Sequence, residues 1–287
     1  MLHITECPRD AMQGIKEPIA TASKIAYLSK LMQAGFPVID AGSFVSAAAI
    51  PQMADTAEVF DAIMEVKTES EILAIVANQR GAEDAAAHER VSILGYPFSV
   101  SETFQLRNTN ATIDASFDRI KAILEITAKK NKQLRVYLSM AFGNPYGDVW
   151  NEQLVSEMAL RMNNLGIRSL ALADTIGNST PELISSLFST IRKALPAETE
   201  LSLHLHSRPE AVFEKMDAAW DAGCRHIDSA LLGFGGCPMA GDTLTGNMAT
   251  ETLLAWCEKR GIEHGINLEI LSEARALAGE IFHSAAQ

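Results

Sequence analysis

The sequence predicts an α/β protein built as a (β/α)8 TIM barrel with an extra C-terminal helix. Eight short apolar runs alternate with eight longer amphipathic stretches along the 287 residues. Eight such units in roughly 250 residues is the count and size of this barrel. The competing doubly wound sheet usually has a glycine-rich turn after its first strand. Here that turn is Cys7–Gly14, which is not glycine-rich.

The strands are predicted at short runs rich in Leu, Ile, Val and Ala, as buried parallel strands require. In chain order they are Leu2–Thr5, Val38–Ala41, Ile72–Val76, Val91–Leu94, Arg135–Met140, Ser169–Ala173, Leu201–His206 and His226–Ala230.

The helices are predicted at the amphipathic stretches between these strands. They are Thr21–Ala34, Pro51–Val66, Gly81–His88, Thr112–Lys130, Asn151–Leu165, Pro181–Ala194, Pro209–Ala222 and Thr250–Arg260, followed by the extra helix Leu268–His283. Gly35, Gly166 and Gly223 follow helices as C-caps, and Pro181 and Pro209 stand in first turns. These are ordinary stop and start signals of helices.

No linker, low-complexity tract or repeat divides the chain, so we expect one catalytic domain over residues 1–287. The net charge of −12 argues against nucleic acid as a partner. The apolar stretches are too short to span a bilayer, so no membrane partner is expected. The N-terminus has no basic segment followed by an apolar one, so we expect a cytoplasmic protein.

The four cysteines show no metal-finger or CxxC spacing and are expected to be free thiols. They are Cys7, Cys224, Cys237 and Cys257. One of them could be catalytic.

Two histidines stand one residue apart in the alternating run Leu201–His206. Side chains two apart on a strand point to the same side, so His204 and His206 face one place. Paired neutral imidazoles suit a divalent metal. The alternative is a histidine pair that merely lines a polar strand face.

Closure of a barrel brings more ligands to this pair, because the first strand lies beside the eighth and the eighth beside the seventh. Asp10 follows the first strand and Asn247 ends the loop after the eighth, at the C-terminal face where active sites of this fold lie. Two imidazoles and two oxygens leave about two positions of an octahedral ion open, which suits Mg²⁺ or Mn²⁺. Alternatively, Asp10 caps a helix or pairs with Arg9, and Asn247 belongs to a turn or a helix cap.

The chain resembles the 3-hydroxy-3-methylglutaryl-CoA (HMG-CoA) lyase family of the DRE-TIM metallolyase superfamily over nearly its whole length. The matching motifs are Glu6–Gln13, Ala34–Ser46, Pro51–Met53, Ala173–Gly177, His204–His206, Gly233–Pro238 and Gly246–Glu251.

The resemblance implies cleavage of HMG-CoA to acetyl-CoA and acetoacetate, as in leucine degradation and ketone body formation. It implies a divalent cation, Mg²⁺ or Mn²⁺, as cofactor and an acyl-CoA thioester as substrate, and a homodimer is the family expectation. By resemblance, the metal ligands are Asp10, His204, His206 and Asn247, the catalytic pair is Arg9 and Cys237, and the substrate site includes Arg9, Gln13, Asp174 and Thr175.

The chemistry gives these roles a rationale. Breaking the bond between C2 and C3 leaves charge on a thioester enolate, which a fixed guanidinium such as Arg9 can stabilise. A thiol on a glycine-rich loop, such as Cys237, can supply the proton that quenches the carbanion. Either His204 or a metal-bound water can take the proton of the C3 hydroxyl.

Four departures from the family pattern put the substrate in question. Asp40 stands where the family has a glutamate that steadies the catalytic arginine, so Arg9 is held less well or the backbone lies closer. Ala41 and Gly42 replace threonines and are expected to enlarge the acyl pocket. Ser207–Glu210 replaces Asp-Thr-Tyr-Gly, which removes a contact behind the metal and adds Arg208 near the mouth. The cysteine loop is one residue longer.

The alternative function is a related lyase, aldolase or Claisen-type enzyme acting on another 3-hydroxyacyl-CoA. A barrel that binds metal and acyl-CoA without turnover is a third, but it leaves Arg9 and Cys237 without a role. Lys16, Asn78 and Arg80 either meet the CoA phosphates or are ordinary surface. The basic run Lys129–Lys132 ends a helix at the opposite face and is not assigned to CoA.

Overall fold

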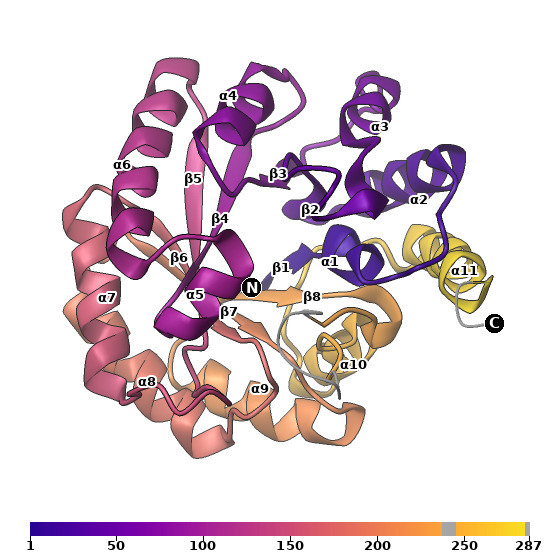
Figure 1. Ribbon diagram of the computed structural model, residues 1–287. Helices are drawn as coiled ribbons and strands as arrows, with labels where there is room; N and C mark the ends of the chain where they lie inside the picture. Colours follow the sequence, from indigo (N-terminus) through magenta and orange to yellow (C-terminus); the bar gives the residue numbers. More distant parts are fainter. Residues whose placement is uncertain (237–244, 285–287) are drawn as a thin grey trace.

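The computed structural model describes residues 1–236 and 245–284, and within them eight parallel strands close into a barrel in sequence order (Figure 1). β1 pairs with β8, with His3 opposite His226 and Glu6 opposite Ser229, and this pairing completes the ring. The strands are β1 His3–Glu6, β2 Val38–Ser43, β3 Glu71–Ile75, β4 Ile93–Ser99, β5 Gln133–Ser139, β6 Ser169–Asp174, β7 Glu200–Leu205 and β8 His226–Ser229. The predicted TIM barrel is confirmed.

Helices surround this barrel on its outside, and the C-terminal helix packs against α2 (Figure 1). The helices are α1 Pro8–Gln13, α2 Thr21–Ala34, α3 Thr56–Ala62, α4 Gln79–Ala87, α5 Glu102–Thr109, α6 Ile113–Lys130, α7 Glu152–Asn164, α8 Pro181–Ala194, α9 Val212–Asp221, α10 Thr250–Arg260 and α11 Leu268–Ser284. The described part of the chain also contains three short 3-10 helices, η1 Pro51–Met53, η2 Pro209–Ala211 and η3 Leu231–Gly233.

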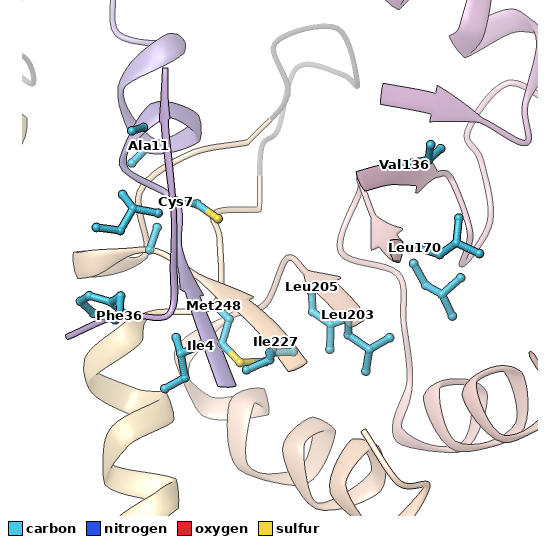
Figure 2. Packing of buried hydrophobic residues seen from close by; sticks show 14 of the residues in the cluster. Ile4, Cys7, Ala11, Phe36, Val136, Leu170, Leu203, Leu205, Ile227 and Met248 are labelled. Carbon is cyan, nitrogen blue, oxygen red and sulfur yellow. The ribbon is translucent and has the colours of Figure 1, made fainter. Parts of the chain in front are cut away.

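The hydrophobic core has two parts. A large cluster fills the space between strands and helices, where Ile4, Leu203 and Ile227 lie among the side chains of Figure 2. A small cluster fills the barrel interior and consists of Val38, Leu73, Ile75, Ile93, Tyr137 and Ala171. This two-sided burial is why the strands are apolar on both faces.

Gly95 in β4 is what allows the interior cluster to pack. A Cβ at Gly95 would lie 2.7 Å from Ile75 Cδ1 and 3.3 Å from Tyr137 Cε2. The glycine therefore makes room for larger side chains from the two neighbouring strands.

The structure differs from several local predictions. The turn predicted at Cys7–Gly14 contains the helix α1, and the helix predicted at Pro209–Ala222 is divided into η2 and α9. The predicted helix Pro51–Val66 is divided into η1 and α3, because the Thr56 hydroxyl binds Met53 O and Ser43 N and so competes with helical hydrogen bonding. β4 runs on to Ser99 through Gly95 and Pro97, residues that are usually absent from strand interiors. The short helix α5 was not predicted; Ser101 caps it by accepting a hydrogen bond from Phe104 N.

Candidate active site

The candidate site lies at the C-terminal ends of β1, β7 and β8. Asp10, in the first turn of α1, meets His204 at the end of β7 and His206 just beyond it. One ligand atom from each of the three residues lies within 4.8 Å of the others. The structure thus brings together three of the four residues proposed as metal ligands.

The two imidazoles face each other through their Nε2 atoms, 3.3 Å apart. Burial lowers the pKa of His206 to about 4, so this ring is neutral at neutral pH. Burial also opposes protonation of His204, but hydrogen bonding and charge from Asp228 outweigh it and raise its pKa. Two adjacent nitrogen lone pairs beside a carboxylate suit a divalent cation, so the donor set fits the metal that the sequence predicts.

Asp10 completes this donor set as an anion. Burial alone would raise its pKa, but the charge of Arg9 and the neighbouring histidines lower it to about 2. The carboxylate therefore stays ionised over the physiological range and supplies a hard oxygen.

Asn247 reaches the same place from the segment after β8. Its Nδ2 donates to Asp10 Oδ2 at 2.7 Å and to Phe234 O at 2.9 Å. The backbone is fixed beside His206, since Ser207 N donates to Gly246 O at 3.0 Å. A ligand role for the Asn247 oxygen requires rotation of its amide, because the nitrogen now faces Asp10.

The planar guanidinium of Arg9 is held by hydrogen bonds beside Asp10 and the two histidines. Its Nε and Nη2 donate to the two oxygens of Asp40 at 3.1 and 2.5 Å. Its Nη1 donates to Gln13 Oε1 at 2.8 Å and to Asp10 Oδ1 at 3.1 Å. The shorter carboxylate of Asp40 thus still makes a two-point contact, the geometry that orients a guanidinium best.

Asp228 is a residue of the site that was not predicted from the sequence. It lies on β8, is 1% exposed, and its Oδ2 is 3.1 Å from His204 Nδ1. An acceptor at Nδ1 places the proton there and leaves Nε2 free to bind a cation. The signal was an aspartate inside an otherwise apolar strand, next to the strand that carries the histidines.

Asp174 and Thr175 occupy different positions although they are adjacent. Thr175 lines the cavity, and its hydroxyl accepts a hydrogen bond from Met140 N at 3.0 Å. The Asp174 carboxylate is buried behind the wall, where it accepts from Asn178 N and Ser179 N and lies 3.7 Å from Lys215 Nζ. Asp174 therefore shapes the turn that carries Thr175.

Cys237 lies outside the described residues. Among the described cysteines, Cys7 is nearest to the candidate site, with its sulfur within 4.8 Å of ligand atoms of His204 and Asp228. Burial, together with the negative charge of Asp228, raises the pKa of the Cys7 thiol well above its usual range, so it stays protonated.

A cavity of about 190 Å³ opens beside these groups. Its lining is Arg9, Asp10, Gln13, Val45, Ala49, Ile50, Ile75, Ala77, Pro97, Phe104, Asn108, Tyr137, Ser139, Ala173, Thr175, His204 and His206. Lys16, Asn78 and Arg80 are not part of this lining, and Asn78 instead caps α4 by accepting from Gly81 N.

Ala41 and Gly42 do not line the cavity either, so the expectation that they enlarge an acyl pocket is wrong. A Cβ at Gly42 would lie 2.6 Å from Thr56 Cγ2 and 2.8 Å from Phe60 Cζ. Gly42 thus faces α3, outside the barrel, and is small because α3 packs closely there.

Comparison with known proteins agrees with this architecture. The HMGL-like family matches residues 3–278. The chain is 34% identical to the mitochondrial hydroxymethylglutaryl-CoA lyase of Mus musculus over 269 residues, which cover 93% of this chain and 81% of the relative. It is 32% identical to the hydroxymethylglutaryl-CoA lyase of Pseudomonas mevalonii, covering 93% and 87% of the two chains.

Comparison with solved structures also finds similarity to HMG-CoA lyases. An HMG-CoA lyase from Acinetobacter baumannii in complex with coenzyme A and 3-methylmalate superposes with a TM-score of 0.91 at 32% identity, covering 98% of this chain and 91% of that one. Family match, identity and barrel extend over nearly the whole chain. The chain therefore belongs to the HMGL-like family and is an HMG-CoA lyase-like carbon–carbon lyase.

Proposed function

We propose that the protein cleaves HMG-CoA, or a close 3-hydroxyacyl-CoA relative, to acetyl-CoA and a 3-oxoacid. The observation that carries the proposal is the cluster of Asp10, His204 and His206 directly beside Arg9, which Asp40 clamps. The Acinetobacter baumannii lyase binds coenzyme A, which supports an acyl-CoA thioester as the substrate of this chain.

The reaction breaks the C2–C3 bond, and its electron pair moves onto the thioester as an enolate. The C3 hydroxyl loses its proton and becomes a ketone, and C2 gains a proton. Mg²⁺ or Mn²⁺ held by Asp10, His204, His206 and a rotated Asn247 would lower the pKa of the hydroxyl and orient the substrate.

Arg9 is the group that stabilises the enolate in this proposal. Its guanidinium is buried and keeps one edge on Asp40, while Nη1 points toward Asp10 and Gln13. A cation fixed in advance needs no reorganisation when charge develops on the thioester oxygen. Arg9 touches Asp10, so it lies next to the centre where the C3 hydroxyl would bind.

The proton transfers need two further groups. His204 donates from Nδ1 to Asp228, and as a metal ligand it uses Nε2, so it has no lone pair left to act as the base. A water molecule in the cavity then takes the hydroxyl proton. We assign protonation of C2 to Cys237, whose thiol can act as a general acid.

Assembly and compartment stay predictions. Within the part of the chain that the structure describes, no helix is long and apolar enough to cross a membrane. Relatives carry both mitochondrial and cytoplasmic names. We keep the cytoplasmic expectation and a homodimer as proposals; gradient fractionation and light scattering test them.

The test of the function is an assay of the purified protein with HMG-CoA and Mg²⁺ or Mn²⁺, following acetoacetate. We expect Arg9→Gln and Cys237→Ala to lower kcat by orders of magnitude with little change in the melting temperature. Cys224→Ala, at a thiol bonded to His226 O away from the candidate site, is the matched control and should retain activity. A folded protein that cleaves no 3-hydroxyacyl-CoA in the presence of metal would end the proposal.

A further inference from the structure

The cavity beside the candidate metal centre has a polar half and an apolar half. Arg9, Asp10, Gln13, Thr175, His204 and His206 form the polar half, and Asn108 of α5 and Ser139 of β5 are two further polar residues of the lining. We call the apolar surface contributed by β3, β4, β5 and the turn after β3 the apolar floor; it consists of Ile75, Ala77, Pro97 and the ring of Tyr137. We call the apolar side chains from loops and α5 the apolar rim; they are Ala49, Ile50 and Phe104.

The apolar floor extends from the barrel interior to the half-buried residues Ala77 and Pro97. Ile75 and Tyr137 are each 7% exposed and belong to the interior cluster, which packs against Gly95. The rim is shallower at Ala49, which is exposed on the loop before η1. Floor and rim overlap in depth, since Phe104 of the rim is buried, and they differ in the strands, loops and helix from which they come.

The floor also adjoins the metal centre. The Tyr137 ring meets the His204 ring edge-on, with centroids 5.9 Å apart and planes at 85°. A substrate whose C3 hydroxyl binds beside His204 thus places C3 next to the apolar floor.

The directions available to the substituents of C3 follow from their chemistry. The hydroxyl and the free carboxylate belong with the polar half. The thioester arm leads to the charged phosphates of CoA, which must reach solvent, so it passes the rim. The fourth substituent, a methyl group in HMG-CoA, is left to face the floor.

We propose that the apolar floor binds a hydrocarbon chain longer than methyl on C3, so that the preferred substrates are 3-hydroxy-3-alkylglutaryl-CoA thioesters. The inference rests on the proposed function and specifies its substrate class. The reaction is unchanged: the C2–C3 bond breaks, the C3 hydroxyl loses its proton, C2 gains one, and the products are acetyl-CoA and a 3-oxoacid with the longer chain.

Three neighbouring strands contribute apolar surface to the floor, which is more than one methyl group covers. Each further buried methylene is worth about fourfold in binding. If the chain is held in the transition state, two added methylenes should raise kcat/KM by roughly tenfold over HMG-CoA.

The experiment compares kcat/KM for HMG-CoA with its C3-propyl and C3-pentyl analogues, in wild type and in two variants. Ala77→Leu fills the floor, and Ala49→Leu adds the same volume at the rim. We expect wild type to prefer propyl over methyl by roughly tenfold. Ala77→Leu should lose this preference, because its kcat/KM should fall more for the propyl and pentyl analogues than for HMG-CoA, and Ala49→Leu should keep the preference.

Other outcomes are equally clear. A wild-type preference for HMG-CoA over both analogues overturns the inference but leaves the proposed function standing. An equal loss for all three thioesters in Ala77→Leu overturns it too, because the floor then contacts the pantetheine arm. If circular dichroism shows that Ala77→Leu does not fold, Ile75→Ala replaces it. This variant enlarges the floor and must shift the preference toward the pentyl analogue. An unshifted preference overturns the inference. Activity with none of the thioesters refutes the proposed function itself.

Discussion

Asp228 should control metal affinity although it does not reach the metal position. Its Oδ2 lies 3.1 Å from His204 Nδ1, and its Oδ1 lies 3.8 Å from Arg135 Nη1. Asp228→Asn keeps the shape but replaces one acceptor oxygen with an NH₂ group. Because Arg135 only donates, the Asn oxygen should turn toward Arg135 and the NH₂ toward His204.

His204 must then accept at Nδ1 and carry its proton on Nε2, the atom that faces His206. This tautomer cannot bind a cation without losing that proton. Changing the acceptor behind a metal-bound histidine typically costs 10- to 100-fold in metal affinity. We expect a loss of about 100-fold in Mn²⁺ affinity, at the upper end, because Asp228 is nearly fully buried and solvent does not replace it.

Electron paramagnetic resonance titration of free Mn²⁺ measures this affinity without any substrate. The free energy of unfolding should fall by only about 1–3 kcal/mol, since Arg135 keeps Glu200 and Thr5 as partners. Asp217→Asn is the control, because Asp217 bonds Trp256 and Arg260 on the outer helices. An Asp228→Asn protein that is folded and binds Mn²⁺ within threefold of wild type would refute the tautomer argument.

Three further predictions concern other parts of the site. Arg9→Gln should lower kcat by about 10²- to 10³-fold, because loss of a preorganised donor typically costs that much. The Mn²⁺ affinity of this variant should stay within tenfold of wild type in the same titration. An unchanged kcat contradicts the role of Arg9 in stabilising the enolate. Mn²⁺ affinity should fall as the pH drops below the raised pKa of His204, because protons then compete with the cation for the imidazole. Asp10, with a pKa of about 2, stays ionised. A Mn²⁺ affinity that does not change between pH 5 and 8 contradicts this prediction. Gly42→Ala should destabilise the fold by about 1–3 kcal/mol through its clash with Thr56 and Phe60, and should leave acyl preference unchanged; a shift in preference would restore the acyl-pocket hypothesis.

The fold could be predicted because its determinants are local. Each buried strand is an apolar run, and residues such as the C-cap Gly35 and the first-turn Pro181 mark the helix ends. The neighbourhood of Asp10 and the two histidines was also predictable, because barrel closure puts β7, β8 and β1 side by side. What sequence spacing cannot provide is the orientation of individual side chains, such as the Asn247 amide whose nitrogen faces Asp10.

The second strand shows most clearly why side-chain orientation cannot be predicted from sequence spacing. Val38 belongs to the interior cluster and Asp40 reaches Arg9 beside the cavity, so simple alternation places Gly42 inside as well. The β2–β3 register shifts between Asp40 and Gly42, however, and Gly42 faces α3. A β-bulge inserts one residue and reverses the alternation beyond it, which no count of residues reveals. Bulges commonly re-aim side chains next to active sites, and here the shift begins at the carboxylate that clamps Arg9. Substrate selectivity must therefore be sought in the residues that line the cavity, beginning with the apolar floor.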